Sequence, residues 1–339
     1  MSYARKYRLL TQTITPRKLR NFWNIYTSYF QAKNSRDPRL KGMPIKIGIE
    51  PTTACNLRCP ACISGLRAFS RPTGMLDMEL FKKMIDELSP ELIYLLMYFQ
   101  GEPFLNKNFL PMVRYAHEKK VYVATSTNGH FITAEKAIEV VKSGLSEVIF
   151  SIDGTTQESY ATYRIGGKLE RVIQSMRYLL EARKKLGKLN PFVILQFIVL
   201  RPNQHQIEDV RILGRQLGVD HVAIKTAQLY DFEEGHELIP DLPKFSRYKK
   251  TADGKYAIKN KLENQCWKMW QGMEITWDGK VLPCCFDKDA EYIMGEFPET
   301  SIREIWQSET YKAFRRKLLT SRSHIEMCQN CSEGTKVWA

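Results

Sequence analysis

Three cysteines, Cys55, Cys59 and Cys62, lie close together in one short segment of the chain. Soft thiolates favour iron–sulfur clusters or zinc, and three of them can hold a four-iron cluster while one iron stays open to a further ligand. A zinc site needs a fourth ligand, which the segment does not supply. A disulfide needs an oxidising compartment, and no apolar stretch of the signal-peptide kind opens the sequence. The segment therefore predicts a cluster with one reactive coordination position.

The elements around this segment predict a parallel α/β sheet. Residues 45–50 alternate in a pattern typical of a strand, so the cysteines would lie in the loop at its carboxyl end, where strand–helix barrels build their active sites. Six strand–helix units predict an open, partial barrel rather than a closed eight-stranded one. Further strands are expected at 92–99, 121–125, 147–152, 192–199 and 221–225, and helices at 77–88, 108–119, 133–143, 168–187 and 204–217.

The spacing of Cys55, Cys59 and Cys62 resembles the CxxxCxxC signature of radical S-adenosylmethionine (SAM) enzymes. In that family the amino and carboxylate groups of SAM bind the open iron of a [4Fe-4S] cluster. The resemblance implies an α/β fold with a partial (β/α)6 TIM-like barrel over residues 45–225. It also implies that the cluster reduces SAM to methionine and a 5′-deoxyadenosyl radical, which abstracts hydrogen from an unactivated C–H bond.

Polar residues after other predicted strands match positions that this family uses for SAM. The segment Gln100-Gly101-Glu102-Pro103 is similar to the family's GGEP segment, with Gln100 in place of the first glycine. This similarity implies that Gly101 and Glu102 contact the amino group of SAM. Ordinary turns, helix caps and a solvated arginine are the structural alternatives. The remaining implied SAM contacts are Asn128, Ser151 and Asp153 near the methionine or ribose, and Arg164 at the carboxylate.

A second group of cysteines lies near the C terminus. Residues 272–283 are expected to form a hairpin that turns at Asp278-Gly279, and a helix with a capping box begins at Ser301. The arrangement resembles the twitch domain, a shortened SPASM extension with one auxiliary [4Fe-4S] cluster, and its spacing is similar to that of the radical SAM dehydrogenase of an aminocyclitol antibiotic pathway. A four-cysteine zinc site is the alternative. The implied ligands are Cys266, Cys284, Cys328 and Cys331, which leaves Cys285 spare.

Basic residues are concentrated at the N terminus of the chain. The formal net charge is +14, and residues 1–41 contribute +9 of it with Asp37 as their only acid. A helix beginning near Pro16 is expected to carry an aromatic face within residues 17–30. Such a helix can contact an anionic membrane surface, dock on an acidic partner or pack against the barrel. The face consists of Leu19, Phe22, Trp23, Tyr26 and Phe30.

We expect four parts in the chain. A basic amphipathic arm covers residues 1–44, the barrel 45–225, a linker 226–262, and a small twitch/SPASM-like α+β iron–sulfur domain 263–339. No apolar run reaches the roughly 18 residues of a membrane-spanning helix. The protein is therefore expected in the cytoplasm. Residues 17–30 offer a way for it to associate with the inner face of the membrane. Nothing in the sequence resembles a nucleic-acid-binding motif.

The two groups of cysteines predict a radical SAM enzyme that oxidises its substrate, because an auxiliary cluster can accept an electron from a substrate radical. A sugar, an aminocyclitol or another small molecule is the expected substrate, since the N-terminal arm is too short and too basic for a precursor-peptide-binding domain. The alternatives are a peptide-modifying epimerase or cross-linking maturase, and a non-enzymatic iron–sulfur or zinc protein. An epimerase would use Cys285 as a catalytic hydrogen donor if its thiol faces the active site. A reductant such as flavodoxin or ferredoxin is the expected protein partner.

Overall fold

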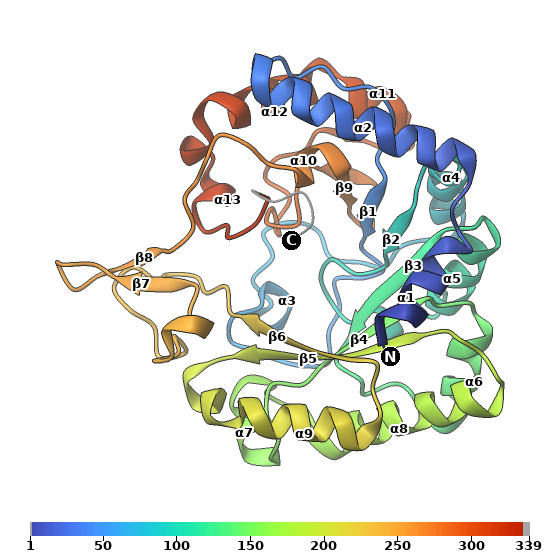
Figure 1. The fold of residues 1–339 in the computed structure, drawn as a ribbon, viewed down its shortest axis with the longest axis vertical. Helices are drawn as coiled ribbons and strands as arrows, with labels where there is room; N and C mark the ends of the chain where they lie inside the picture. Colours follow the sequence, from blue (N-terminus) through green and yellow to red (C-terminus); the bar gives the residue numbers. More distant parts are fainter. Residues whose placement is uncertain (1, 335–339) are drawn as a thin grey trace.

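The computed structural model describes residues 2–334 and has an α/β architecture (Figure 1). Six parallel strands are neighbours in chain order, and the sheet does not close, so the barrel is partial. This confirms the predicted class of fold. The six strands are β1 (Lys46–Ile49), β2 (Tyr94–Leu96), β3 (Tyr122–Thr127), β4 (Glu147–Ser151), β5 (Phe192–Val199) and β6 (His221–Thr226).

Helices that alternate with these strands cover the outer face of the sheet (Figure 1). Their starts follow ordinary capping chemistry: the Asp77 carboxylate, for example, accepts hydrogen bonds from the backbone N–H groups of Glu79 and Leu80. The helical elements of the barrel are α3 (Ile63–Leu66), α4 (Met78–Leu88), η1 (Pro103–Leu105), α5 (Phe109–Glu118), α6 (Ala134–Lys142), α7 (Gln157–Tyr163), α8 (Leu169–Lys185), η2 (Arg201–Gln206) and α9 (Ile207–Leu217).

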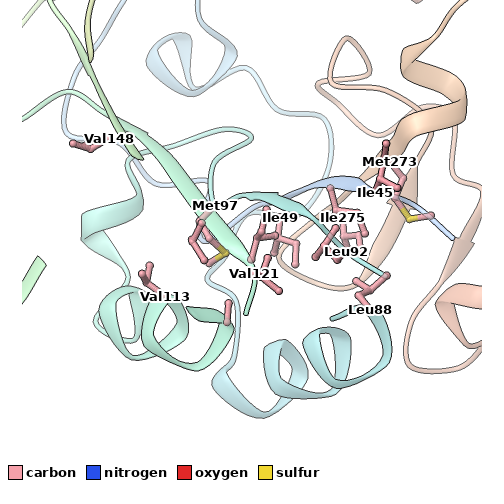
Figure 2. Packing of buried hydrophobic residues seen from close by; sticks show 14 of the residues in the cluster. Ile45, Ile49, Leu88, Leu92, Met97, Val113, Val121, Val148, Met273 and Ile275 are labelled. Carbon is pink, nitrogen blue, oxygen red and sulfur yellow. The ribbon is translucent and has the colours of Figure 1, made fainter. Parts of the chain in front are cut away.

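Alternate residues of each strand enter two different environments. Ile47 and Ile49 of β1 are fully buried in the main core. Figure 2 shows Ile49 and Met97 within this packed layer, with Leu88 and Val113 contributed by the helices beneath it. The intervening strand positions face the interior of the barrel. Near the carboxyl ends of the strands, these inward positions are therefore available to line a site.

The C-terminal cysteine domain continues the same sheet. Strand β9 pairs with β1 in parallel, and β10 and β11 follow in antiparallel order. A Cβ at Gly272 would meet the Lys46 carbonyl oxygen at 1.7 Å, so this junction requires glycine. The predicted hairpin and the capping box at Ser301 are both present. The elements are α10 (Lys268–Gln271), β9 (Gly272–Ile275), β10 (Lys280–Leu282), β11 (Gly295–Glu296), α11 (Ile302–Gln307), α12 (Glu309–Ser321), η4 (Arg322–His324) and α13 (Glu326–Gln329).

The basic N-terminal segment forms two helices that pack on the rest of the chain. Helix α1 (Ser2–Thr11) places Leu9 in a cluster with Phe192 inside the barrel, and Lys6 forms an ion pair of 2.6 Å with Glu147 of β4. Helix α2 (Pro16–Ser35) begins at the expected residue and lies along the C-terminal domain (Figure 1). The arm thus packs against the rest of the chain. Of the predicted aromatic face, Phe22 and Tyr26 are half-buried against the core, whereas Leu19, Trp23 and Phe30 are exposed.

Residues 226–262 contain a small antiparallel pair, β7 (Tyr248–Lys250) with β8 (Tyr256–Ile258), preceded by η3 (Pro243–Phe245). Tyr248 fixes this segment to the body of the protein because its hydroxyl accepts a hydrogen bond from the Leu229 backbone and donates to Asn330. Within residues 2–334, no helix has the length and apolarity needed to cross a bilayer.

Candidate active site

The first cysteine group occupies the loop between β1 and α3, at the carboxyl end of the central sheet. Cys59 is buried, and Cys55 and Cys62 are half-buried; all three are free thiols. Burial raises the pKa of the Cys55 thiol to about 11, and burial also raises the pKa of Cys59. The cysteines bind iron as thiolates, so iron binding must displace the protons from these side chains.

The turn after β2 is attached directly to this loop. Gly101 has a φ of +72°, and a Cβ there would meet the Thr52 carbonyl oxygen at 2.3 Å. The Gly101 N–H donates to the Ser64 hydroxyl at 2.9 Å, and the Glu102 N–H donates to the Ala54 carbonyl at 2.7 Å. Glycine is needed here because only a residue without a side chain permits this approach.

The Glu102 carboxylate is occupied by donors of this chain. It accepts hydrogen bonds from the Thr127 hydroxyl and the Asn128 N–H, both at 2.7 Å, and from the Phe104 N–H at 3.3 Å. Burial raises its pKa to about 7, although these bonds oppose the shift. In this arrangement Glu102 joins the ends of β2 and β3, and its contact with SAM stays a prediction.

Three other predicted residues lie around the cysteines. The Asn128 amide donates to the Asn56 side chain at 2.7 Å and approaches the Cys55 sulfur at 3.9 Å. Arg164 donates from Nε to Asp153 at 2.6 Å and from Nη1 to the Cys59 sulfur at 3.7 Å. Asp153 is fully buried and also accepts from the Ile198 N–H. Asp153 thus orients the arginine that faces the cysteine loop.

A cavity of about 450 Å³ opens beside this loop at the carboxyl ends of the strands. Cys59 and Cys62 line it, and so do Ser151 and Arg164, whose contacts with SAM stay predictions. Cys285, from the C-terminal domain, lines the same cavity. The structure therefore brings one cysteine of the C-terminal group to the cavity beside the first group. Gly101, Glu102, Asn128 and Asp153 do not line the cavity and lie behind the residues that do.

Several polar residues of the cavity were not predicted from the sequence. Gln196 and Lys225 come from β5 and β6, and Arg247 comes from the linker segment. A polar residue inside an apolar strand, as Gln196 is within Phe192–Val199, is a signal that could have located an inward-facing site position. Lys225 and Arg247 offer no comparable local signal.

Glu274 of β9 is the most unusual of the unforeseen cavity residues. It lies opposite Gly48 of β1, and a Cβ at Gly48 would meet Glu274 Oε2 at 1.6 Å. That oxygen is buried and has no hydrogen-bond partner among the described residues, and burial raises the carboxyl pKa well above its usual value. Glycine on the neighbouring strand thus makes room for a buried carboxyl group at the edge of the cavity.

The second cysteine group converges in the C-terminal domain. Cys266, Cys328 and Cys331 are buried, and Cys284 is half-buried. The segment after Cys331 returns over Cys266: the Trp267 N–H donates to the Gly334 carbonyl at 2.8 Å, and a Cβ at Gly334 would meet the Cys266 sulfur at 2.3 Å. Residues distant in the sequence are in this way placed around one site.

Cys284 and Cys285 are adjacent thiols with different surroundings. Both line a small cavity of about 120 Å³ beside β9, but only Cys285 of the two also lines the larger cavity. A hydrogen bond from the Cys284 thiol lowers the pKa of Cys285. This bond would be lost if Cys284 bound iron as a thiolate, since Cys284 would then have no proton to donate. The ligand role of Cys284 and the spare role of Cys285 stay predictions.

The surroundings of the C-terminal cysteines fit an anionic cluster. Arg322 is fully buried and donates to the Cys331 sulfur at 3.5 Å, and it makes no ion pair with a carboxylate among residues 2–334. A buried unpaired cation is costly, so an anionic group such as a thiolate-bound cluster would compensate it. The described residues contain no group of three or more His, Cys, Asp or Glu spaced for a single metal ion. A four-iron cluster has a different requirement, since each iron takes its own cysteine.

Family models match both parts of this site. Residues 49–211 match the radical SAM superfamily, and residues 266–332 match the SPASM iron–sulfur cluster-binding domain. The chain belongs to the radical SAM superfamily and to its SPASM branch, and it is an enzyme whose cofactors are [4Fe-4S] clusters and SAM. These matches confirm the family that the cysteine spacings indicated, the predicted fold class and the predicted cofactors.

Curated relatives match most of the chain at low identity. The tungsten-containing aldehyde ferredoxin oxidoreductase cofactor-modifying protein of Pyrococcus furiosus is 27% identical over 84% of this chain and 86% of its own length. The PqqA peptide cyclase of Rhodopseudomonas palustris is 26% identical over 81% of this chain and 76% of its own.

Solved structures share the fold. SuiB of Streptococcus suis bound to the precursor peptide SuiA has a TM-score of 0.63 at 14% identity, covering 92% of this chain and 75% of that one. BtrN in complex with AdoMet and 2-DOIA has a TM-score of 0.54 at 18% identity, covering 87% and 95%. At these identities the likeness concerns the fold alone.

Proposed function

We propose that this chain modifies a peptide by radical SAM chemistry, with net loss of hydrogen from the substrate. The observation that carries the proposal is the cavity lined by Cys59 and Cys62 on one side and by Cys285 on the other. Cys55, Cys59 and Cys62 would hold the SAM-binding cluster, and Cys266, Cys284, Cys328 and Cys331 the auxiliary one. When bound, SAM supplies a 5′-deoxyadenosyl radical that removes a hydrogen atom from the substrate.

The residues of this chain would position the reactants and exclude water. Asp153 holds Arg164 beside the cysteine loop, where the guanidinium can pair with the carboxylate of SAM. Ser151 lines the cavity beside Ser126, at 3.5 Å between their hydroxyl oxygens, and offers hydrogen bonds to ribose hydroxyls. Gly101 and Glu102 would hold the turn after β2 against the cysteine loop, where acceptors for the amino group of SAM are expected. Asn128 would hold the part of the cysteine loop that contains Cys55.

A peptide substrate is supported over the small molecule that sequence reasoning favoured. PqqA peptide cyclases are among the matching relatives, and mycofactocin maturase MftC of Mycobacterium tuberculosis is 30% identical over 52% of this chain and 43% of its own. An open groove of about 580 Å³ adjoins the cavity, and the two share Ile63, Gln228 and Lys288 in their linings. A chain segment laid in this groove would reach the cavity beside Cys62.

The groove also has a charge preference. Its lining includes Asp231, Glu233, Asp289 and Glu326 with apolar Leu66 and Phe286, so a segment with basic and apolar residues would complement it. A low-potential reductant such as flavodoxin or ferredoxin would supply the electron that SAM cleavage needs.

Two substrate libraries presented to the reconstituted enzyme test this proposal. One contains short degenerate peptides, and the other contains aminocyclitols and amino sugars, each with SAM and dithionite. We expect peptides to raise 5′-deoxyadenosine release above the substrate-free rate and to lose two hydrogen atoms by mass spectrometry. The variant Cys55→Ala/Cys59→Ala/Cys62→Ala is the control. If only aminocyclitols or sugars raised 5′-deoxyadenosine release, oxidation of a small molecule would replace peptide modification as the proposed function.

Epimerisation is a second candidate because Cys285 lines the cavity. The thiol would return a hydrogen atom to the substrate radical, and the resulting thiyl radical would take up one electron from the reductant and one proton. The peptide mass would then be unchanged in H₂O and would gain one deuterium per turnover in D₂O. Cys285→Ala would abolish that incorporation while 5′-deoxyadenosine is still released. A product that has lost two hydrogen atoms and gained no deuterium would exclude this candidate.

A further inference from the structure

The outer face of α2 carries an exposed aromatic stripe, formed by Leu19, Phe22, Trp23, Tyr26 and Phe30. Trp23 is 60% exposed, Leu19 49% and Phe30 37%. The rings are in mutual contact along the helix, with centroids 5.7 Å apart for Trp23 and Tyr26 and 4.8 Å apart for Tyr26 and Phe30. This is one continuous apolar surface, and contiguous exposed apolar surfaces mark interaction sites.

The opposite face of α2 holds the helix in place. Asn21 exchanges two hydrogen bonds of 2.8 Å with the Met43 backbone, and the Tyr29 ring contacts Trp267 and Trp270. Ile25 and Ala32 are buried in the main core. Within the stripe, Phe22 and Tyr26 are half-buried against the same core, so the exposed part is Leu19, Trp23 and Phe30. Replacing Trp23 and Phe30 therefore leaves the packed face of the helix in place.

The charges around the stripe favour an anionic occupant. Residues 2–36 contain eight Lys or Arg and no Asp or Glu. Three of the eight form ion pairs with carboxylates elsewhere in the chain, and Lys18 is buried. Arg20 and Lys33, near the two ends of the stripe, are exposed and make no ion pair among the described residues. The stripe thus combines apolar rings with uncompensated positive charge.

We infer that α2 binds an anionic lipid surface through the aromatic stripe, with Arg20 and Lys33 at the headgroups. A lipid surface fits better than a protein groove because α2 lies at the outer edge of the molecule as a single straight helix (Figure 1). Tryptophan and tyrosine join apolar rings to a polar tip, which suits the interfacial layer of a membrane. This inference does not depend on the proposed substrate, and it would keep the enzyme reversibly at a membrane surface.

Vesicle sedimentation with the cluster-containing full chain tests the inference. Vesicles of phosphatidylcholine with phosphatidylglycerol are compared with vesicles of phosphatidylcholine alone, at low and high salt. We expect binding to the anionic vesicles, weakened at least tenfold by Trp23→Gln/Phe30→Gln. Arg20→Gln/Lys33→Gln should lower binding and its dependence on salt.

Matched controls distinguish lipid binding by the stripe from non-specific adsorption and from misfolding. Ile212→Gln removes another exposed apolar side chain, on α9, and Lys142→Gln removes an exposed lysine of α6; both should bind as the wild type does. All variants should retain the wild-type iron content. Absence of wild-type binding, or binding unchanged by the stripe variants, would overturn the inference. A dimer of the wild type that Trp23→Gln abolishes would assign the stripe to a second copy of the chain instead.

Discussion

Arg322 is the side chain whose chemistry depends most directly on the auxiliary site. Its guanidinium is buried among Cys266, Cys328 and Cys331, and its remaining bonds go to backbone carbonyls such as that of Gln265 at 2.8 Å. A positive charge beside a cluster stabilises the reduced form, since reduction makes the cluster more negative. Arg322 should therefore raise the reduction potential of the auxiliary cluster and make it a better electron acceptor.

Arg322→Gln should lower that potential by about 60 mV or more, which is at least tenfold in a one-electron equilibrium. The measurement is a redox titration followed by electron paramagnetic resonance, in a background lacking Cys55, Cys59 and Cys62 so that only the auxiliary cluster contributes. Arg316→Gln, an exposed position on α12, is the matched control. An unchanged potential at full iron content would remove the electrostatic role of Arg322.

Glu102 should make stability depend on pH. The folded protein holds this proton up to about pH 7, whereas the usual carboxyl value is 4.5. Between these values the folded state binds more protons than the unfolded state, so the free energy of unfolding should fall as pH rises through this window, by on the order of 3 kcal/mol. Glu102→Gln should flatten the dependence in thermal melts between pH 5.5 and 7.5. The same slope in both proteins would contradict the assignment.

Among the elements, the turn after β2 and the cysteine loop form one unit. Gly101→Ala should displace the loop, because the new Cβ would clash with the Thr52 carbonyl oxygen in addition to the strain of a positive φ. We expect a lower melting temperature and loss of about four irons. Gly187→Ala is the control, since Gly187 also has a positive φ, of +60°, but no atom within 4 Å of the added Cβ. Equal iron content in the two variants would show that the contact is unimportant.

Local elements followed from the sequence because their determinants are local. The hairpin at Asp278-Gly279, the capping box at Ser301 and the start of α2 at Pro16 each depend on a few neighbouring residues. The pairing of β9 with β1 depends on residues more than two hundred positions apart, so no local pattern indicates it. The aromatic stripe left two outcomes open for a related reason: periodicity locates an apolar face but does not say how much of that face the fold will cover.

The site was predictable to a similar degree. The spacing of Cys55, Cys59 and Cys62 predicted the first cluster, because ligands in one loop are close in sequence. The second set, spread from Cys266 to Cys331, was predicted only through the resemblance to a twitch domain. The meeting of Cys285 with Cys59 and Cys62 at one cavity required the tertiary fold. Glu274 also depends on tertiary pairing, since only the register of β9 with β1 places its carboxyl group over Gly48.

At the scale of the whole molecule, the barrel and the C-terminal domain share a sheet and a core. Ile47 of β1, Ile275 of β9 and Trp306 of α11 belong to one cluster of buried side chains. A chain ended after residue 262 would expose the edge of β1 and much apolar surface. We expect such a fragment to aggregate or stay unfolded, and the full chain to melt in one calorimetric transition. Two separate transitions, or a folded fragment, would show that the domains are independent.

The most direct test of the account is the iron and acid-labile sulfide content after anaerobic reconstitution. We expect about eight irons per chain in the wild type and about four in either Cys55→Ala/Cys59→Ala/Cys62→Ala or Cys266→Ala/Cys328→Ala/Cys331→Ala. The first variant should also lose SAM cleavage, and the second should retain it. A wild type with only one cluster, or with zinc at the C-terminal cysteines, would contradict the two-cluster site on which the proposed oxidation depends.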